Sequence, residues 1–252
     1  ADGPFAPAAR IGQLVRAGDV VARVEGEPVR ALIDGVVRGM LPEGTPVTCG
    51  MKSGDIDPRG IVEYCHTISD KARAIAGGAT VVQLREKTLS ARAFYDLALR
   101  VKQITAPCGV PLIINDRVDV ALAAAADGVH IGQSDLPARE VRRVIGREML
   151  LGVSASTLAE AVSAARDGAD YLGVGAMYAT ATKDDACIVT MDALRQIRQA
   201  VSLPIVIIGG INEQTAPHFR DTGVDGLAVV SAIVAKEDIE GAARTLIRRF
   251  RG

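Results

Sequence analysis

The sequence has few aromatic residues and no tryptophan. Aromatic residues make up 3% of its 252 positions, whereas hydrophobic residues make up 48%. A core of Ala, Val, Ile and Leu without large rings is typical of parallel β-sheets that are covered by helices. The length allows one barrel domain, or a small module followed by a barrel.

Three further features are absent, and each absence excludes a class of protein. The formal net charge is only −1, so no general attraction to nucleic acid or to an anionic membrane is expected. No apolar run approaches the ~20 residues of a membrane span, and no signal-peptide pattern is visible, which together predict a cytoplasmic protein. The cysteines form no CxxC pair, which argues against a zinc site or a disulfide framework; they are Cys49, Cys65, Cys108 and Cys187.

Residues 1–60 are predicted to form a small β-rich module. Short apolar runs at 20–24, 29–33 and 35–37 alternate with turns, one of them expected at Glu27-Pro28. The spacing Gly12…Val15…Gly18, with a looser echo over 39–47, indicates two similar β units in a pseudo-symmetric sandwich.

Two resemblances concern this module. The run Ala17-Gly-Asp-Val-Val21, followed by Asp34-Gly-Val-Val37, resembles the biotinyl and lipoyl hammerhead domains. The expected hairpin tip, residues 25–29, has no Lys, so no biotin or lipoate is expected. Through residues 52–59 and 64–75, the stretch 1–78 is similar to the C-terminal part of an accessory protein of selenium-dependent molybdenum hydroxylases.

From residue 61 to 252, β-like and helix-like segments alternate, which predicts an α/β protein with a (β/α)₈ TIM barrel. Strands are expected at 62–67, 80–84, 111–115, 128–131, 149–153, 171–174, 205–208 and 226–229. Ser90 is a predicted N-cap, Thr157-Leu-Ala-Glu160 is a predicted capping box, and further helices are expected at 192–199 and 238–250. Only residues 71–76 lie between the first strand and Gly77-Gly78, which precede the second strand, so a shortened first helix is expected.

Polar and charged residues follow several of these predicted strands. Gln83-Leu-Arg-Glu-Lys87 follows the second strand, Asp116 the third, Asp135 the fourth, and Ala179-Thr-Ala-Thr-Lys183 the sixth. Because the carboxyl ends of barrel strands meet at one face, these residues are predicted to form a site for a magnesium diphosphate.

The runs that carry this pattern resemble those of thiamine-phosphate synthases, and they occur in that family's order. They are 77–87, 113–122, 127–136, 152–154, 173–183, 209–211 and 229–233. The resemblance implies a transferase that joins 4-amino-2-methyl-5-(diphosphooxymethyl)pyrimidine to a thiazole phosphate carboxylate and releases diphosphate. The implied partners are these small molecules, and the oligomeric state is left open, a homo-oligomer included.

The resemblance also implies roles for residues of this sequence. Asp116 and Asp135 would hold Mg²⁺, since carboxylate oxygens suit that ion. The catalytic cations would be Arg85, Lys87 and Lys183, all directed at the diphosphate. The implied substrate-binding set is Gln83, Leu84, Arg85, Glu86, Lys87, Asn115, Ser154, Thr180, Ala181, Thr182, Lys183, Gly210, Val230 and Ser231.

Within that set, each group of residues has a part of a substrate to bind. Gln83 and Asn115 would bind the aminopyrimidine, and Ser154 would contact the pyrimidine or the diphosphate. Thr180 and Thr182 would face the thiazole carboxylate. The thiazole phosphate would lie on backbone amides at Gly209-Gly210 and Val230-Ser231.

Other interpretations concern residues beside the site. Arg117 and Asp119 are interpreted as a helix-start ion pair, and His130 as a packed, hydrogen-bonded histidine rather than a base. Ser156 stands where many relatives, including the thiazole tautomerases, have a histidine that shuttles protons, which argues against a tautomerase.

A second functional hypothesis stays open beside the synthase. It is a non-catalytic accessory or ligand-binding protein of molybdenum-hydroxylase maturation or of thiamine metabolism. The shortened first helix and the appended N-terminal module favour it, whereas Lys87, Asp116, Asp135 and Lys183 together favour the enzyme.

Overall fold

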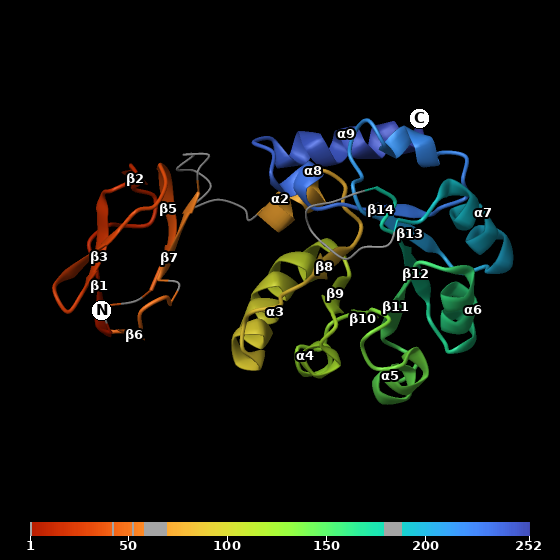
Figure 1. Cartoon of the computed structure of the whole chain (residues 1–252), viewed down its shortest axis with the longest axis horizontal. Coiled ribbons are helices and arrows are strands. Elements are labelled where there is room, and N and C mark those ends of the chain that lie inside the picture. Colours follow the sequence, from red (N-terminus) through yellow and green to blue (C-terminus); the bar gives the residue numbers. More distant parts are fainter. Residues whose placement is uncertain (1, 42, 52, 58–69, 179–187) are drawn as a thin grey trace. The chain divides into compact units, whose positions relative to one another are not determined.

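The computed structural model describes residues 2–41, 43–51, 53–57, 70–178 and 188–252. The chain divides into two compact units, Ala1–Ser69 and Asp70–Gly252 (Figure 1). Each unit has its own hydrophobic core and is described by itself. None of the described helices is long and apolar enough to cross a membrane.

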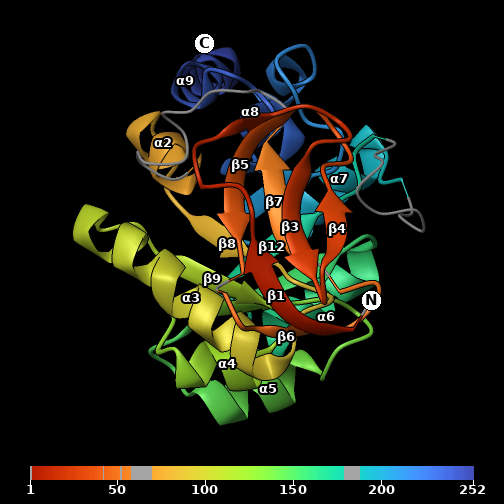
Figure 2. The ribbon, with the colours of Figure 1, turned by 90° about the vertical axis from the view of Figure 1, so that its left-hand side faces the viewer.

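The N-terminal unit contains two small antiparallel sheets, whose main strands are seen face-on in Figure 2. One sheet has the order β4-β3-β1-β6 and the other the order β2-β5-β7. The strands are β1 (Gly3–Pro7), β2 (Leu14–Val15), β3 (Val20–Val24), β4 (Glu27–Arg30), β5 (Gly35–Met40), β6 (Pro46–Val47) and β7 (Gly54–Asp57). Alternate apolar side chains from these strands, such as those of Phe5, Val15 and Val37, form the interior.

The hairpin between β3 and β4 corrects a detail of the sequence prediction. Val24 pairs with Glu27, so the turn consists of Glu25-Gly26 rather than Glu27-Pro28. Both turn residues have positive φ, 49° and 84°, which is the geometry of a two-residue type I′ hairpin. The strand after this turn is therefore Glu27–Arg30 and not 29–33 as expected.

A sequence repeat has a structural counterpart in this unit. Gly12, Val15 and Gly18 have equivalents in Gly44, Val47 and Gly50, which overlap the predicted echo over 39–47 and extend it to residue 50. All four glycines have positive φ, and Val15 and Val47 are both buried. The spacing G-x-x-V-x-x-G thus marks two turns that flank a short, inward-facing strand.

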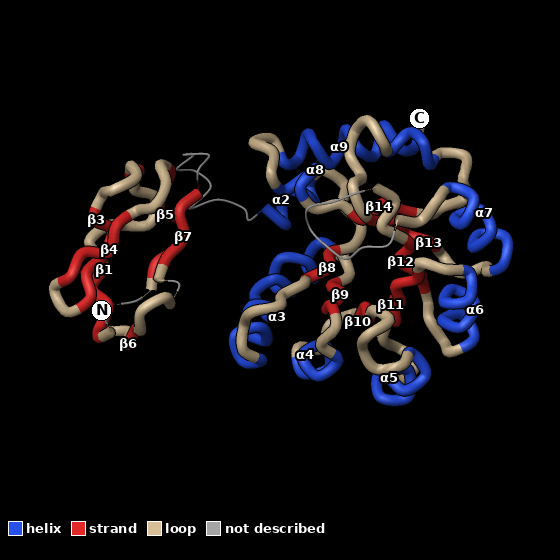
Figure 3. The backbone as a smooth tube through the Cα atoms, viewed as in Figure 1, coloured by secondary structure: helices blue, strands red, loops and turns tan. Residues whose placement is uncertain are grey.

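The C-terminal unit contains seven parallel strands in the order β14-β13-β12-β11-β10-β9-β8, which curl with helices on their outer side (Figures 1 and 3). The strands are β8 (Val82–Leu84), β9 (Leu112–Asn115), β10 (Gly128–Ile131), β11 (Leu150–Ala155), β12 (Tyr171–Val174), β13 (Ile205–Ile208) and β14 (Gly226–Ala228). Seven of the eight predicted strands are therefore present. The first, at 62–67, lies outside the described residues, and the fold that is seen is a curled, TIM-like parallel sheet.

Helices connect these strands and cover the sheet. They are α2 (Asp70–Ala76), α3 (Ala91–Thr105), α4 (Val118–Ala123), α5 (Ala138–Ile145), α6 (Leu158–Arg166), α7 (Met191–Ala200), α8 (Ser231–Val234) and α9 (Ile239–Arg251), with 3₁₀ turns η1 (Ala106–Cys108) and η2 (Ala216–Phe219). The side chain of Ser90 caps α3, and Thr157 and Glu160 form the predicted capping box of α6. Helix α2 spans only seven residues and packs against α9 and α3.

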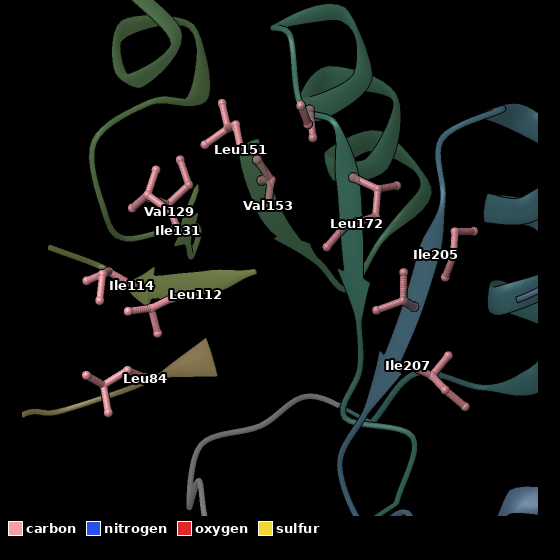
Figure 4. Close-up of a cluster of buried hydrophobic side chains, with 14 of the residues drawn as sticks. Leu84, Leu112, Ile114, Val129, Ile131, Leu151, Val153, Leu172, Ile205 and Ile207 are labelled. Atoms are coloured by element: carbon pink, nitrogen blue, oxygen red, sulfur yellow. The ribbon is translucent and has the colours of Figure 1, made fainter. Parts of the chain in front are cut away.

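Alternation along the strands separates an outer face from an inner one. Outward side chains, among them Leu112, Leu151 and Leu172, pack against the helices in the main core (Figure 4). The intervening residues point to the concave side of the sheet. Several of these are polar or are glycine, so the concave side is available for a site at the carboxyl ends of the strands.

Candidate active site

The carboxyl ends of β8, β9 and β10 bring a lysine and two aspartates together. Lys87, in the loop after β8, donates from Nζ to Oδ2 of Asp116, which directly follows β9. Asp135, after β10, is near enough to both for each to act on its pKa. Three residues that are far apart in the sequence thus form one charged cluster, as the sequence predicted for neighbouring parallel strands.

Asp116 has an unusual backbone conformation. Its φ is 64°, in the left-handed region that Asp adopts more readily than most residues. Its N–H donates to the carbonyl of His130 on β10 (2.8 Å), and the next N–H, of Arg117, donates to the carbonyl of Asn115 (2.8 Å). These bonds hold the chain in a sharp turn at the strand end, which directs the carboxylate toward Lys87.

The pKa of Asp135 is raised above its ordinary value. Burial is the main cause, and the neighbouring Asp116 carboxylate raises the pKa further. A hydrogen bond from the N–H of Gly132 to Asp135 Oδ2 (2.7 Å) and the charge of Lys87 act in the opposite direction. Two neighbouring carboxylates offer a place where a cation would be stabilised.

The loop after β8 is ordered by Glu86. Its Oε1 accepts hydrogen bonds from the N–H groups of Lys87 and Thr88 (both 2.8 Å) and from the Thr88 hydroxyl (2.9 Å). The hydrogen bonds from Thr88 are the largest cause that lowers the pKa of Glu86, so the group stays ionised. Glu86 therefore shapes the loop that carries Arg85 and Lys87, and Arg85 is left exposed without an ion pair among the described residues.

The pyrimidine-binding residues of the prediction lie on different faces. Asn115 ends β9 on the concave side and is 8% exposed, and Ser154 on β11 is half-buried there. Gln83 also points to the concave side. Leu84, by contrast, is buried in the core between sheet and helices, so only its backbone is available to a ligand.

Two residues that the sequence analysis did not place in the site join these side chains. His130 on β10, only 7% exposed, lies with Nε2 3.0 Å from Ser154 Oγ and Nδ1 3.0 Å from the hydroxyl of Tyr171 on β12. The interpretation of His130 as a packed, hydrogen-bonded residue is confirmed. Tyr171 was recognised only as a strand residue, although inward-facing alternation along 171–174 marks its position.

The ends of β13 and β14 lie on the other side of the same edge. Gly209 and Gly210 follow β13 with φ of 96° and 65°, and a Cβ on Gly209 would be 2.5 Å from the Cβ of Ala176. Val230 and Ser231 stand where the chain leaves β14 and enters α8, and both are exposed. Gly209 therefore permits a close turn that no residue with a side chain could make.

Some predicted residues lie outside or beside this geometry. Thr180, Ala181, Thr182 and Lys183 are outside the described residues. Arg117 and Asp119 form the predicted ion pair (Nε–Oδ1 2.8 Å), and this hydrogen bond lowers the pKa of Asp119. Ser156 donates a hydrogen bond to the carbonyl of Gly175 (3.0 Å), so it ties two strand ends together.

The metal prediction concerns two carboxylates rather than a cluster. Within the described parts of the chain, no group of three or more His, Cys, Asp or Glu side chains could hold a metal ion. Two carboxylates, those of Asp116 and Asp135, agree with the coordination that Mg²⁺ prefers. This ion usually binds one or two carboxylates and completes its coordination shell with water and substrate oxygens. The charged cluster therefore fits an ion that arrives with an anionic substrate.

Comparison with known proteins agrees with this geometry. The family model described as thiamine monophosphate synthase matches residues 63–233. The thiamine-phosphate synthase of Clostridium botulinum is 57% identical over 71% of this chain and 84% of its own length, and that of Chloroflexus aurantiacus is 59% identical over 69% and 80%. The solved thiamine phosphate pyrophosphorylase of Pyrococcus furiosus is 38% identical, with a TM-score of 0.67 over 72% of this chain and 87% of its own. The chain therefore belongs to the thiamine monophosphate synthase family.

Proposed function

We propose that this chain is a thiamine-phosphate synthase, a transferase that joins the aminopyrimidine methyl diphosphate to a thiazole phosphate and releases diphosphate. The observation that carries the proposal is the cluster of Lys87, Asp116 and Asp135 at the carboxyl ends of adjacent strands. The curated relatives named thiamine-phosphate synthase support it at 57% and 59% identity.

Each part of the site would serve one part of the reaction. Asp116 and Asp135 would hold Mg²⁺, which would neutralise charge on the departing diphosphate. Arg85 and Lys87, together with Lys183, would contact the same anion. Because the chemistry is the loss of an anionic group, the protein would act mainly by positioning the reactants and stabilising charge.

The two substrates would lie at different parts of the strand-end face. Gln83, Asn115 and Ser154 would hold the aminopyrimidine, with the backbone of Leu84 and the Glu86 turn supporting that pocket. Backbone amides at Gly210, Val230 and Ser231 would receive the thiazole phosphate, and Thr180 to Thr182 its carboxylate.

The proposal also includes the full architecture. It takes the curled parallel sheet to be part of a (β/α)₈ barrel, for which an eighth strand is expected at 62–67. Residues 1–60 would be an appended module that carries neither biotin nor lipoate, since its hairpin turn Glu25-Gly26 has no lysine.

The decisive experiment measures thiamine phosphate formation from the two purified substrates, with and without Mg²⁺. We expect product only with Mg²⁺, and a loss of more than about 100-fold in kcat/KM in Asp116→Asn, since the metal acts on the leaving group. Asn tolerates the left-handed φ of this position, so the variant should fold.

Asp192→Asn is the matched control. It removes an exposed carboxylate that pairs with Arg195 on α7 and contacts none of the described site residues named above, and it should keep full activity. Absence of product in the wild-type chain, with diphosphate still bound, would instead support a barrel that binds these ligands without turnover.

A further inference from the structure

A chain of polar side chains crosses the concave side of the sheet beneath the charged cluster. Ser154 on β11, His130 on β10 and Tyr171 on β12 are linked by contacts of 3.0 Å, although His130 and Tyr171 are 41 positions apart in sequence. Three neighbouring strands thus contribute to one connected network.

The rings of His130 and Tyr171 fit beside each other because Gly152 and Gly173 have no side chains. A Cβ on Gly152 would lie 2.2 Å from Tyr171 Cζ and 2.4 Å from His130 Nδ1, and a Cβ on Gly173 would lie 2.8 Å from His130 Cε1. Contacts that short do not occur between real atoms, so both positions must lack a side chain while the two rings are in place. The rings are therefore packed in fixed positions, with centroids 5.5 Å apart.

The hydrogen-bond directions in the network follow from acid strength. A neutral imidazole has one acceptor nitrogen and one N–H, so only one of the two neighbouring hydroxyls can donate to it. The phenol of Tyr171 is a far stronger acid than the alcohol of Ser154, and it takes the acceptor. His130 then accepts at Nδ1 and donates from Nε2 to Ser154 Oγ.

We propose that His130 and Tyr171 are positioning residues that fix Ser154 as a hydrogen-bond donor toward the aminopyrimidine. Ser154 receives the His130 proton on its oxygen, so its own hydrogen points to the ligand. This inference rests on the proposed function, and it adds the cause of substrate selectivity at that site.

The polarity fits a 4-aminopyrimidine and rejects its oxo analogue. The ring nitrogen beside the amino group accepts a hydrogen bond, whereas the same nitrogen of a 4-oxo ring carries a hydrogen and donates. A Ser154 hydroxyl that is fixed as a donor would be left unpaired against the oxo ring, and buried unpaired groups are costly.

The first test needs no substrate. The chain has three histidines, so the ring ¹⁵N signals of His130 can be assigned by their loss in His130→Gln. We expect a neutral ring with its proton on Nε2 in the wild type, and a loss of that tautomer preference in Tyr171→Phe. A proton on Nδ1 in the wild type would overturn the inference, whether or not the chain proves to be a synthase.

The second test compares Tyr171→Phe with Tyr95→Phe, which removes the same atom from helix α3 outside the network. We expect Tyr171→Phe to lower kcat/KM for the aminopyrimidine diphosphate by about 3- to 10-fold, the loss of one neutral hydrogen bond. The thiazole KM should be unchanged, and the preference for the amino over the 4-oxo substrate should fall by a similar factor.

The outcomes of this comparison separate positioning from general stability. Tyr95→Phe should leave activity and selectivity unchanged. If Tyr171→Phe slows both pyrimidines equally, or raises both substrate KM values together, the hydroxyl serves only packing and the inference fails. If the wild-type chain forms no product, the proposed function fails, and the histidine tautomer alone decides the hydrogen-bond directions.

Discussion

The packing of the two rings against Gly152 makes a strong prediction about stability. A methyl group at Gly152 would overlap the rings of Tyr171 and His130, at 2.2 Å and 2.4 Å from their nearest atoms. Overpacking of this kind costs about 1–3 kcal/mol. Displacing the rings would also break the hydrogen bond between them, at about 0.5–1.5 kcal/mol. Gly152→Ala should therefore lose about 1.5–4.5 kcal/mol of unfolding free energy.

Gly226→Ala is a matched control for this change. Gly226 lies on the same concave side of the sheet, on β14, where a Cβ would have Val206 Cγ2 as its nearest neighbour at 3.6 Å. Both Gly→Ala substitutions lower the conformational entropy of the unfolded chain to the same extent, which changes the free energy of unfolding by about 0.4–1 kcal/mol in each variant. The difference between the two variants thus isolates the overlap with the rings.

Urea unfolding followed by helical circular dichroism is the suitable assay. All helices of the described residues belong to the unit Asp70–Gly252, so the signal reports on the unit that contains both glycines. A difference between the two variants below about 0.5 kcal/mol, the usual size of a neutral surface change, would refute the close packing of His130 and Tyr171 against Gly152.

Three further predictions concern the charged edge and a helix cap. Because burial and Asp116 raise the pKa of Asp135, ionisation of Asp135 destabilises the fold as pH rises above 3.8. In thermal scans at neutral pH, Asp135→Asn should therefore be at least as stable as the wild type. The variant should, however, lose the stabilisation that Mg²⁺ gives to the wild type, and a variant that Mg²⁺ still stabilises would contradict the metal site. The pKa of Glu86 is lowered, chiefly by hydrogen bonds from Thr88, so the contribution of Glu86 to stability is present above pH 4.5 and is lost as pH falls. The melting temperatures of the wild type and Glu86→Gln should differ at neutral pH and converge at acidic pH. A difference in melting temperature that does not change with pH would argue against a stabilising role of the Glu86 carboxylate. Thr157→Ala removes the capping box of α6 and should lower the free energy of unfolding by about 1 kcal/mol. This loss corresponds to a melting temperature that is about 2–4 °C lower. An unchanged melting temperature would show that the cap does not stabilise the fold.

Much of the C-terminal unit could be predicted from the sequence because its signals are local. The predicted strands from 80–84 onward occur within a few residues of their expected bounds, since each is a short apolar run between turns and helix caps. Ser90 and Thr157 were predicted as caps from the residues directly around them. The charged cluster could also be predicted, because residues that follow parallel strands meet at one edge.

The N-terminal hairpin shows where local signals mislead. Glu27-Pro28 looks like a turn because proline is common in turns, yet both residues lie in β4 and the turn is Glu25-Gly26. The pairing of Val24 with Glu27 decides the turn, and pairing depends on how the strands meet. Local sequence signals therefore placed this turn two residues too late.

By itself, the sequence determined the order of strands and helices, the capping residues, and which polar side chains stand at the strand ends. The tertiary structure decided the rest: the left-handed turn that joins Asp116 to Lys87, the influence of Asp116 on the pKa of Asp135, and the contact between His130 and Tyr171. The physical reason is that caps and strands depend on neighbours along the chain. Contacts across the concave side depend instead on sheet curvature, and on side chains absent at Gly152 and Gly173.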